Sequence, residues 1–186
     1  SVALVLNKPF IGVNHLEGHL YASWLIQGID SPAENPGFPL ACLIASGGHT
    51  DLVLMEGHGV YRLMGRTRDD AAGEAFDKAA RILGLGFPGG PEIQRVAKTI
   101  QGETLPVLPR AWMRDTLDFS FSGVKTALLH MAQQAGVYPP GNGKLTDEEV
   151  ESAVRRLAAA FQQSVVDVMV VKLLEMAKRY HAKGVV

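Results

Sequence analysis

Two histidines one helical turn apart are the first residues in this sequence that could do chemistry. His15 and His19 enclose a Leu-Glu-Gly segment. Residues i and i+4 lie on the same face of an α-helix, so both imidazoles can reach one metal ion. Imidazole ligands suit zinc or iron, and a third ligand, usually a carboxylate, is needed. His49 could lie nearby, while the carboxylate stays unassigned. The structural alternative is that the two polar residues cap the start of a helix.

The glutamate between these histidines does not fit a metalloprotease. The zincin motif needs a glutamate directly after the first histidine, where it acts as the general base. Glu17 instead lies two residues after His15, which is roughly 200° around the helix at about 100° per residue. The spacing therefore argues against a peptidase.

A glycine-rich loop is the second candidate. The segment 46–50 reads Ser-Gly-Gly-His-Thr and follows the apolar run 40–45. Paired glycines let backbone N–H groups approach a phosphate without a Cβ in the way. A plain hairpin turn is the alternative, because Gly-Gly is common there. The spacing alone leaves both interpretations open.

Three acidic residues form the third candidate group. Asp69 and Asp70 precede a helix predicted over 71–83, where they would complement the helix dipole. Asp77 lies seven residues after Asp70, on the same face, and could accept hydrogen bonds from ribose hydroxyls. A surface ion pair between Asp77 and Arg81, four residues on, is the structural alternative.

Other residues have a functional and a structural interpretation side by side. Gly73 lowers the helix propensity of its segment and indicates close packing or ligand approach. The Phe-Pro-Gly-Gly-Pro segment 87–91 could cradle a nucleotide or only turn a corner. Ser122 could cap a helix, and Lys125 could be solvated or contact a polyanion. Cys42 lies in an apolar run and is expected to be buried rather than catalytic.

The elements that must position these residues alternate between strands and helices. We predict strands over 10–14, 40–45, 52–55 and 60–64, and an edge strand over 119–121. We predict helices over 15–27, 71–83, 92–100, 123–134 and 146–180. Thr146 and Glu149 form a capping box at the start of the last helix. Segments 28–39 and 136–144 are rich in turn residues, and the second is a candidate subdomain joint. The pattern predicts a mixed α/β fold.

The composition is that of a globular chain. Of 186 residues, 47% are hydrophobic and 20% charged. The net charge of −1 shows no global footprint for nucleic acid binding, and one cysteine excludes an internal disulfide. No uninterrupted apolar run reaches about 18 residues, which predicts no membrane span. Because the chain begins at Ser1 without methionine and ends on an apolar pair typical of a buried strand, we expect it to be part of a longer protein.

Taken together, these motifs are more specific than any one of them. Their order along the chain is VNHLEGH, SGGHTDL, TRDDAAGEAFDKAAR, FPGGPEI and FSFSGVKTA. This order resembles the tRNA adenosine threonylcarbamoyltransferase family, TsaD, once described as a sialoglycoprotein endopeptidase, over essentially the whole chain. The resemblance implies the actin-like superfold of sugar kinases and Hsp70, here an incomplete α/β domain over 1–186. It also implies transfer of threonylcarbamoyl from threonylcarbamoyl-adenylate to N6 of adenosine 37, in tRNAs reading codons that begin with A.

The resemblance assigns roles to individual residues. His15 and His19 match the family's two metal-binding histidines. Asp77 matches its ribose-binding aspartate, and Gly90 a glycine beside the nucleotide. The strand and loop that contact the adenylate correspond to Ile44, Ala45, Ser46, Gly47 and Gly48. Archaeal and eukaryotic cytosolic members tend to carry a metal-binding tyrosine at position 44, so the isoleucine resembles the bacterial type.

The resemblance also implies cofactors and partners. The family uses one divalent metal ion, iron or zinc, and the adenylate substrate; its partners are tRNA, a TsaB-like paralogue and a TsaE-like ATPase, with a homodimer as a further option. A cytoplasmic location without membrane contact is expected. The family's first hairpin, its later nucleotide-binding asparagine and its late metal-binding aspartate have no counterpart within 1–186, so we predict that these residues alone are inactive.

Two other functions share the same motifs. A plain ATPase or kinase of the superfold would use the same loops on ATP. A non-catalytic paralogue that serves in dimerisation would need neither histidine, and retention of both argues against it.

Overall fold

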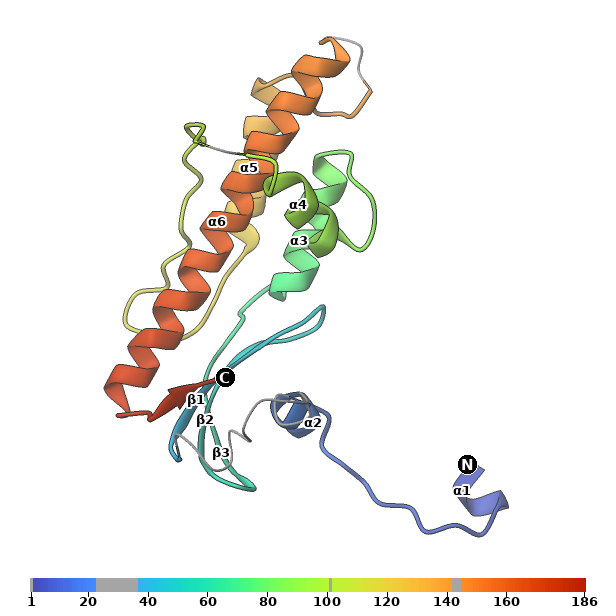
Figure 1. Cartoon of the computed structure of the whole chain (residues 1–186), viewed down its shortest axis with the longest axis vertical. Helices are drawn as coiled ribbons and strands as arrows, with labels where there is room; N and C mark the ends of the chain where they lie inside the picture. The colour runs from blue at the N-terminus through green and yellow to red at the C-terminus, as the bar shows by residue number, and fades with distance from the viewer. Residues whose placement is uncertain (1, 23–36, 101, 142–144) are drawn as a thin grey trace.

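The chain forms a small mixed sheet with helices on both of its faces (Figure 1). The computed structural model describes residues 2–22, 37–100, 102–141 and 145–186. Its helices are α1 (Val2–Val5), α2 (His15–Tyr21), α3 (Ala72–Ile82), α4 (Gly89–Ala97), α5 (Ser122–Gln134) and α6 (Asp147–Arg179). Its strands are β1 (Leu40–Ala45), β2 (Thr50–Gly57), β3 (Val60–Arg66) and β4 (Gly184–Val185). The α/β fold class is confirmed.

The predicted antiparallel meander forms the sheet. The strand order is β3-β2-β1-β4, and β1–β2 and β2–β3 pair antiparallel. In the β1–β2 register Cys42 lies opposite Val53, and Ile44 lies opposite Asp51. The apolar end of the chain adds β4 parallel to β1, which makes the sheet mixed.

Alternation along the strands separates two apolar layers. Ala41 and Leu52 belong to the larger core cluster, which includes side chains of α3 to α6. Their neighbours Cys42 and Val53 belong to a smaller cluster with Leu20 of α2. Because successive side chains of a strand point to opposite faces, α6 and α2 cover opposite faces of the sheet, as Figure 1 shows.

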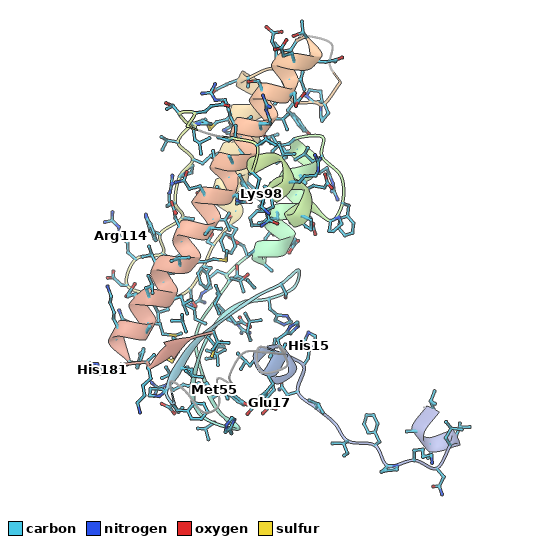
Figure 2. All side chains as sticks on the ribbon, in the orientation of Figure 1. His15, Glu17, Met55, Lys98, Arg114 and His181 are labelled. Carbon is cyan, nitrogen blue, oxygen red and sulfur yellow. The ribbon has the colours of Figure 1, made fainter. Side chains whose placement is uncertain are left out.

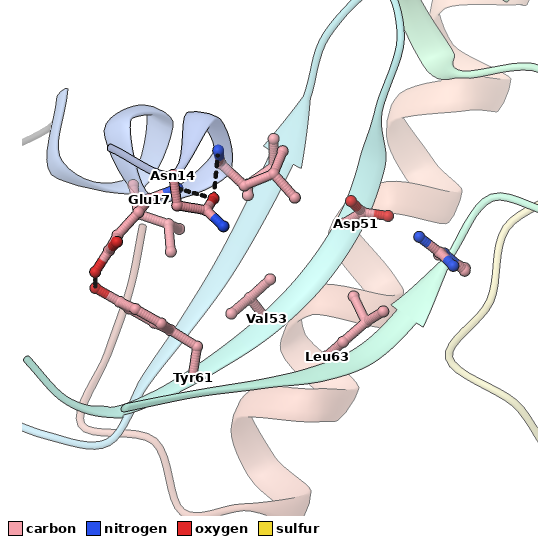
Figure 3. A pocket seen from close by; sticks show the side chains of 10 residues that line it. Asn14, Glu17, Asp51, Val53, Tyr61 and Leu63 are labelled. Atoms are coloured by element: carbon pink, nitrogen blue, oxygen red, sulfur yellow. Dashed lines mark hydrogen bonds between the residues drawn. The ribbon is translucent and has the colours of Figure 1, made fainter. Parts of the chain in front are cut away.

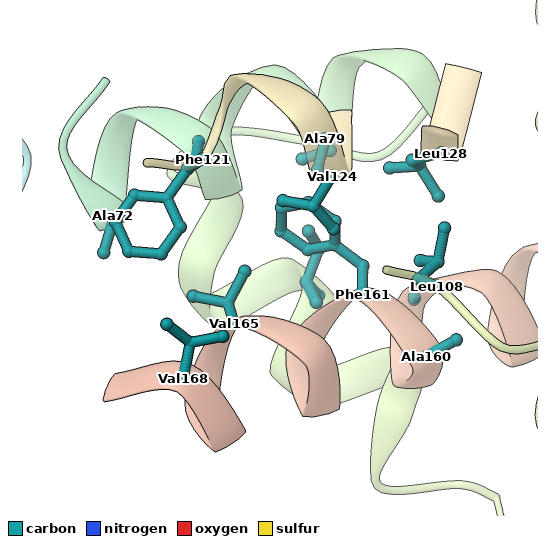
Figure 4. Packing of buried hydrophobic residues seen from close by; sticks show 14 of the residues in the cluster. Ala72, Ala79, Leu108, Phe121, Val124, Leu128, Ala160, Phe161, Val165 and Val168 are labelled. Carbon is teal, nitrogen blue, oxygen red and sulfur yellow. The ribbon is translucent and has the colours of Figure 1, made fainter. Parts of the chain in front are cut away.

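Helix α6 organises the larger core. Phe161 is fully buried, and its ring packs edge-on against Phe76 of α3 with centroids 5.3 Å apart. Val165 of α6 and Val124 of α5 lie in the same cluster (Figure 4). The predicted capping box at Thr146 is confirmed. By length and composition α6 could cross a membrane, but half of its most apolar window is buried within the protein, as in a core helix.

Two predicted strands are wrong. Residues 10–14 are extended but pair with no described strand, and the side chains of Phe10 and Ile11 are each 82% exposed. An extended segment becomes a strand only when a neighbour satisfies its backbone groups. At 119–121 only one isolated bridge forms, between Phe119 and Thr67.

Helix boundaries also differ from the prediction. Helix α4 begins at Gly89 rather than residue 92, so part of the predicted loop 87–91 is helical. Pro91 is tolerated there because the first turn of a helix needs no N–H donor. Helix α2 ends at Tyr21, while the predicted continuation over 23–27 and most of loop 28–39 lie outside the described residues. The subdomain joint stays a prediction; its described part connects α5 to α6, which pack together.

Candidate functional site

The two histidines of α2 converge as their spacing predicts. Asn14 caps the helix, because its side-chain oxygen accepts hydrogen bonds from the backbone N–H of Leu16 at 2.9 Å and Glu17 at 3.2 Å. The Nε2 atoms of His15 and His19 are 3.1 Å apart, and both rings are exposed. Two nitrogens bound to one tetrahedral metal at about 2.0–2.1 Å would be about 3.3 Å apart. The pair therefore fits two positions of a metal site, and the capping role falls to Asn14.

The structure leaves the third metal ligand unassigned. The ring of His49 lies 6.1 Å from that of His15, centroid to centroid. Among residues 2–22, 37–100, 102–141 and 145–186, no three His, Cys, Asp or Glu side chains are close enough together to hold a metal ion. The histidine pair is thus a partial site within the described chain.

The glycine loop is a tight turn between β1 and β2. The backbone N–H of Ser46 donates to the carbonyl of His49 at 2.8 Å, and its hydroxyl accepts from the His49 N–H at 3.1 Å. A Cβ built on Gly47 or Gly48 would meet no atom within 4 Å. The turn interpretation is confirmed, and the open side of these glycines leaves the phosphate interpretation standing as a prediction.

Gly73 joins this loop to α3. Its N–H donates to the carbonyl of Ser46 at 3.1 Å. A Cβ at Gly73 would lie 2.7 Å from the Ser46 carbonyl oxygen and 2.8 Å from the Gly47 Cα. The close packing indicated by a glycine at this helical position is confirmed.

Asp77 joins α3 to α4. Its Oδ1 accepts a hydrogen bond from the N–H of Gly89 at 2.7 Å, and a Cβ at Gly89 would lie 2.5 Å from the Asp77 Cα. The alternative pair of Asp77 with Arg81 is not among the ion pairs of the described residues. Gly90 follows at the open start of α4, where a Cβ would meet no atom within 4 Å. Asp77 and Gly90 therefore lie at the same junction.

The two acids before α3 serve other partners than predicted. Helix α3 begins at Ala72, so Asp69 and Asp70 lie outside its first turn. Asp69 accepts hydrogen bonds from the Phe121 N–H at 2.8 Å and the Ser120 hydroxyl at 2.5 Å, at the start of α5. Burial opposes its charge, but these hydrogen bonds, with those from Ser122, outweigh burial and lower the pKa of Asp69.

Lysines neutralise the second of these acids. Asp70 contacts the ammonium groups of Lys78 at 2.9 Å and of Lys125. Lys125 is therefore paired rather than simply solvated. Ser122 is the first residue of α5 and not its cap, which is Phe121. These contacts hold the start of α5 against the segment that precedes α3.

Cys42 is confirmed as a core residue. Its side chain is fully buried, and burial raises the pKa of the thiol to about 11. A thiol that stays protonated and covered is not a nucleophile at neutral pH.

The two histidines lie beside the end of β1, whereas Asp77 and Gly90 lie apart from them at the junction of α3 and α4. His19 lines a cavity of about 200 Å³ together with Ile44 and Ala45. The loop that follows β1 carries His49, whose ring lies beside that of His15. From this loop, contacts continue through α3 to the start of α4. The candidate metal ligands therefore lie next to the start of the candidate adenylate-binding segment.

One cavity of the structure was not anticipated from the sequence. It has a volume of about 270 Å³ and lies between α2 and the strands (Figure 3). Its polar lining includes Glu17, Tyr61, Asp51 and Arg66. Asp51 is 3% exposed, and its Oδ2 has no hydrogen-bond partner among the described residues. Asp51 lies two residues before Val53 and therefore on the same face of β2. A carboxylate at this otherwise apolar position is the sequence signal that could have predicted the cavity.

The comparisons with known proteins agree on one family. The model of TsaD, tRNA N6-adenosine threonylcarbamoyltransferase, matches residues 1–186. A relative of this name from Dehalococcoides mccartyi is 49% identical over 185 residues, covering 100% of this chain and 50% of the relative. One from Thermomicrobium roseum is 51% identical over 191 residues, covering 98% of this chain and 52% of the relative.

These matches cover nearly all of this chain but only part of each relative. The chain spans about half the length of the curated relatives it matches. The mixed sheet with flanking helices is a part of the actin-like α/β fold of that family. With a family match over every residue and relatives at about half identity, the chain belongs to the TsaD family.

Proposed function

We propose that this chain carries part of an active site for threonylcarbamoyl transfer to tRNA. The donor is threonylcarbamoyl-adenylate, and the acceptor is N6 of adenosine 37 in tRNAs reading codons that begin with A. The observation that carries this proposal is the convergence of the His15 and His19 Nε2 atoms, 3.1 Å apart, beside the glycine loop. The names of the relatives support the reaction class.

The histidine pair would hold one divalent metal ion, zinc or iron. Neutral imidazole nitrogens are ligands that both ions accept. When bound, such an ion supplies Lewis-acid polarisation of a carbonyl or phosphoryl oxygen. A third ligand would come from outside the described residues, which agrees with the half-length of the chain.

The loops would hold the adenylate. Gly47 and Gly48 leave the face of the β1–β2 turn open to a phosphate, which backbone N–H groups could bind. Asp77 uses Oδ1 to anchor Gly89, which holds its carboxylate at the start of α4, where it would accept from ribose hydroxyls. Gly90 leaves room beside it. Such fixed contacts orient the donor for attack.

The reaction itself would be a direct acyl transfer. The N6 amine of adenosine attacks the carbamoyl carbonyl carbon, the bond from that carbon to the phosphate oxygen breaks, AMP leaves, and the amine releases one proton to water. Cys42 is buried with a raised pKa, and the Ser46 hydroxyl accepts backbone hydrogen bonds within its turn. Neither is placed as a nucleophile, so no covalent intermediate on them is proposed.

Partners follow from the same proposal. We expect tRNA to approach the loops that would hold the adenylate, and a TsaB-like paralogue and a TsaE-like ATPase to assist the whole protein in the cytoplasm. A homodimer is a further arrangement to be tested by its mass in solution.

The test compares two activities of the whole protein. Transfer of label from threonylcarbamoyl-adenylate to tRNA is measured beside ATP hydrolysis without tRNA. We expect transfer, and we expect His15→Ala and His19→Ala each to lower it at least about 100-fold. ATP hydrolysis with no transfer would favour the kinase-like alternative. Full transfer by residues 1–186 alone would contradict the prediction that they are inactive.

A further inference from the structure

Apolar packing by itself holds helix α2 only weakly. The helix has seven residues, of which Leu20 is buried and Leu16 and Tyr21 are partly buried against the same apolar cluster. The chain before it is exposed, including Val13 at 76%. A helix of two turns with one buried and two partly buried side chains can still rotate and tilt more easily than a fully packed helix. Something else must fix the direction of its histidines.

The β2–β3 hairpin contacts both the first turn and the last residue of α2. The Tyr61 hydroxyl of β3 donates a hydrogen bond to Glu17 Oε1 at 2.8 Å (Figure 3). At the hairpin turn, His58 Nδ1 lies 2.9 Å from the Tyr21 hydroxyl, and the two rings stack with centroids 5.8 Å apart. One contact is in the first turn of α2 and the other is at its last residue.

These contacts restrict the rotation and tilt of α2, which determine the direction of the His15 and His19 side chains. Glu17 lies midway between His15 and His19 in the sequence but on another side of the helix, as Figure 2 shows for His15 and Glu17. The hydrogen bond from Tyr61 to Glu17 limits rotation of α2 about its own axis. The contact between His58 and Tyr21 limits its tilt. Metal ligands must be held within about 0.5 Å and 10–20° of their working geometry.

Tyr61 is suited to act as a permanent donor. Burial, together with hydrogen bonds to Tyr21 and Glu17, raises the pKa of its hydroxyl. The phenol therefore keeps its proton at physiological pH. A hydrogen bond from it to a carboxylate is of the strong, charge-assisted kind.

We propose that Glu17, Tyr61, Tyr21 and His58, here named the hairpin clamp, are positioning residues that orient α2 so that His15 and His19 converge on one metal ion. The inference rests on the proposed function, since it takes the histidines as ligands. It also gives a role to the glutamate that lies in the wrong place for a peptidase base. The hairpin clamp touches neither metal nor substrate in this account; it acts through the helix.

The experiment uses the whole protein with Co²⁺ as the probe. Affinity is measured by competition with a chelator, and the ligand field is read from the visible absorption of bound Co²⁺. We expect Tyr61→Phe, which keeps the ring and removes the donor, to weaken Co²⁺ binding about tenfold and to shift the spectrum. Glu17→Gln should stay close to wild type, because its amide oxygen still accepts from Tyr61.

Two further variants make the result specific. Tyr180→Phe is the matched control, since its ring contacts Arg62 and packs against the larger core cluster, to which no residue of α2 belongs. It should leave affinity and spectrum unchanged. Glu17→Ala removes the acceptor but leaves the contact between Tyr61 and Tyr21, so it should weaken Co²⁺ binding in the same direction as Tyr61→Phe and by a smaller factor. It also serves as the second variant if Tyr61→Phe unfolds in urea too early to be studied.

A measurement without metal separates the positioning role of the hairpin clamp from the proposed metal site. Hydrogen exchange of the α2 amides in metal-free protein should speed up severalfold in Tyr61→Phe and not in Tyr180→Phe. If wild type binds Co²⁺ and both clamp variants keep its affinity and spectrum, the positioning role is overturned while the proposed function stands. If wild type binds no Co²⁺, the metal of the proposed function fails, and unchanged exchange in α2 would then overturn the hairpin clamp as well.

Discussion

The two halves of the candidate site are held by different kinds of contact. In the half proposed to bind adenylate, here called the adenylate half, α3 meets the β1–β2 loop and α4 through backbone atoms, at Gly73 and Gly89, where no Cβ fits. In the histidine half, α2 is held by side chains, chiefly Leu20 and the hydrogen bonds of Tyr61 and His58.

This difference predicts how each half responds to change. Backbone-to-backbone contacts leave no freedom to adjust, so a single added methyl group must move a whole element. Side-chain contacts can be lost one at a time, and each loss loosens the helix by a limited amount. Substitutions in the adenylate half should therefore destabilise the whole fold. Substitutions in the histidine half should weaken metal binding while the fold persists.

The largest effect is expected at the contact between α3 and α4. Gly89→Ala places a Cβ 2.5 Å from the Asp77 Cα and should lower the free energy of unfolding by about 3 kcal/mol, measured by urea denaturation. Gly90→Ala is the matched control, because its Cβ enters open space. Its free energy of unfolding should be unchanged or rise by up to about 1 kcal/mol. Equal losses in both variants would refute the backbone contact.

A somewhat smaller effect is expected where α3 meets the glycine loop. Gly73→Ala should lower the free energy of unfolding by about 2 kcal/mol and weaken adenylate binding about tenfold, since the added Cβ displaces Ser46 and Gly47. Gly123→Ala tests the same change at the second residue of α5, where a Cβ would meet no atom within 4 Å. Titration calorimetry with a non-hydrolysable adenylate, showing unaltered affinity for Gly73→Ala, would count against the rigid loop.

The carboxylate of Asp69 should make a modest, pH-dependent contribution. Because its pKa is lowered in the folded state, its stabilisation is complete above the unfolded pKa of about 3.9 and is lost as pH falls through the folded pKa. Asp69→Asn should lower the free energy of unfolding at pH 7 by less than about 1 kcal/mol, because the group is exposed and screened by water. Urea denaturation at several pH values should show the difference shrinking toward acid. A difference that grows toward acid would contradict the sign.

The smallest effect on stability is expected from loosening α2, and Cys42 can report it. This thiol is buried in the cluster that Leu20 covers, and its pKa of about 11 keeps it protonated at pH 8. In native protein its alkylation should be slow. Tyr61→Phe should speed the labelling a few-fold while the urea midpoint stays nearly constant, as measured by mass spectrometry. Labelling that changes only in step with global unfolding would show that α2 does not open on its own.

Local features of the site could be predicted from the sequence. The spacing of His15 and His19 places both rings on one helical face whatever the rest of the fold does. The two short apolar runs and the Gly-Gly turn between them specify the β1–β2 hairpin in the same way. The capping box at Thr146 depends on four consecutive residues only. Each of these patterns depends on residues that are close together in the sequence.

The features that the sequence left open depend on residues far apart in it. Asp69 accepts a hydrogen bond from the N–H of Phe121, just before a helix that begins more than fifty residues later, and no local rule connects the two. Glu17 meets Tyr61 only because the sheet brings β3 beside α2.

The incorrect strand prediction over 10–14 has the same cause. An extended segment with suitable residues forms a strand only when a partner strand lies beside it. The sequence by itself determined which side chains share a helix face or a strand face, since bond geometry and periodicity set that. Only the tertiary structure decided which of those faces meet, because packing and long-range hydrogen bonds choose among partners that are equally suitable in sequence.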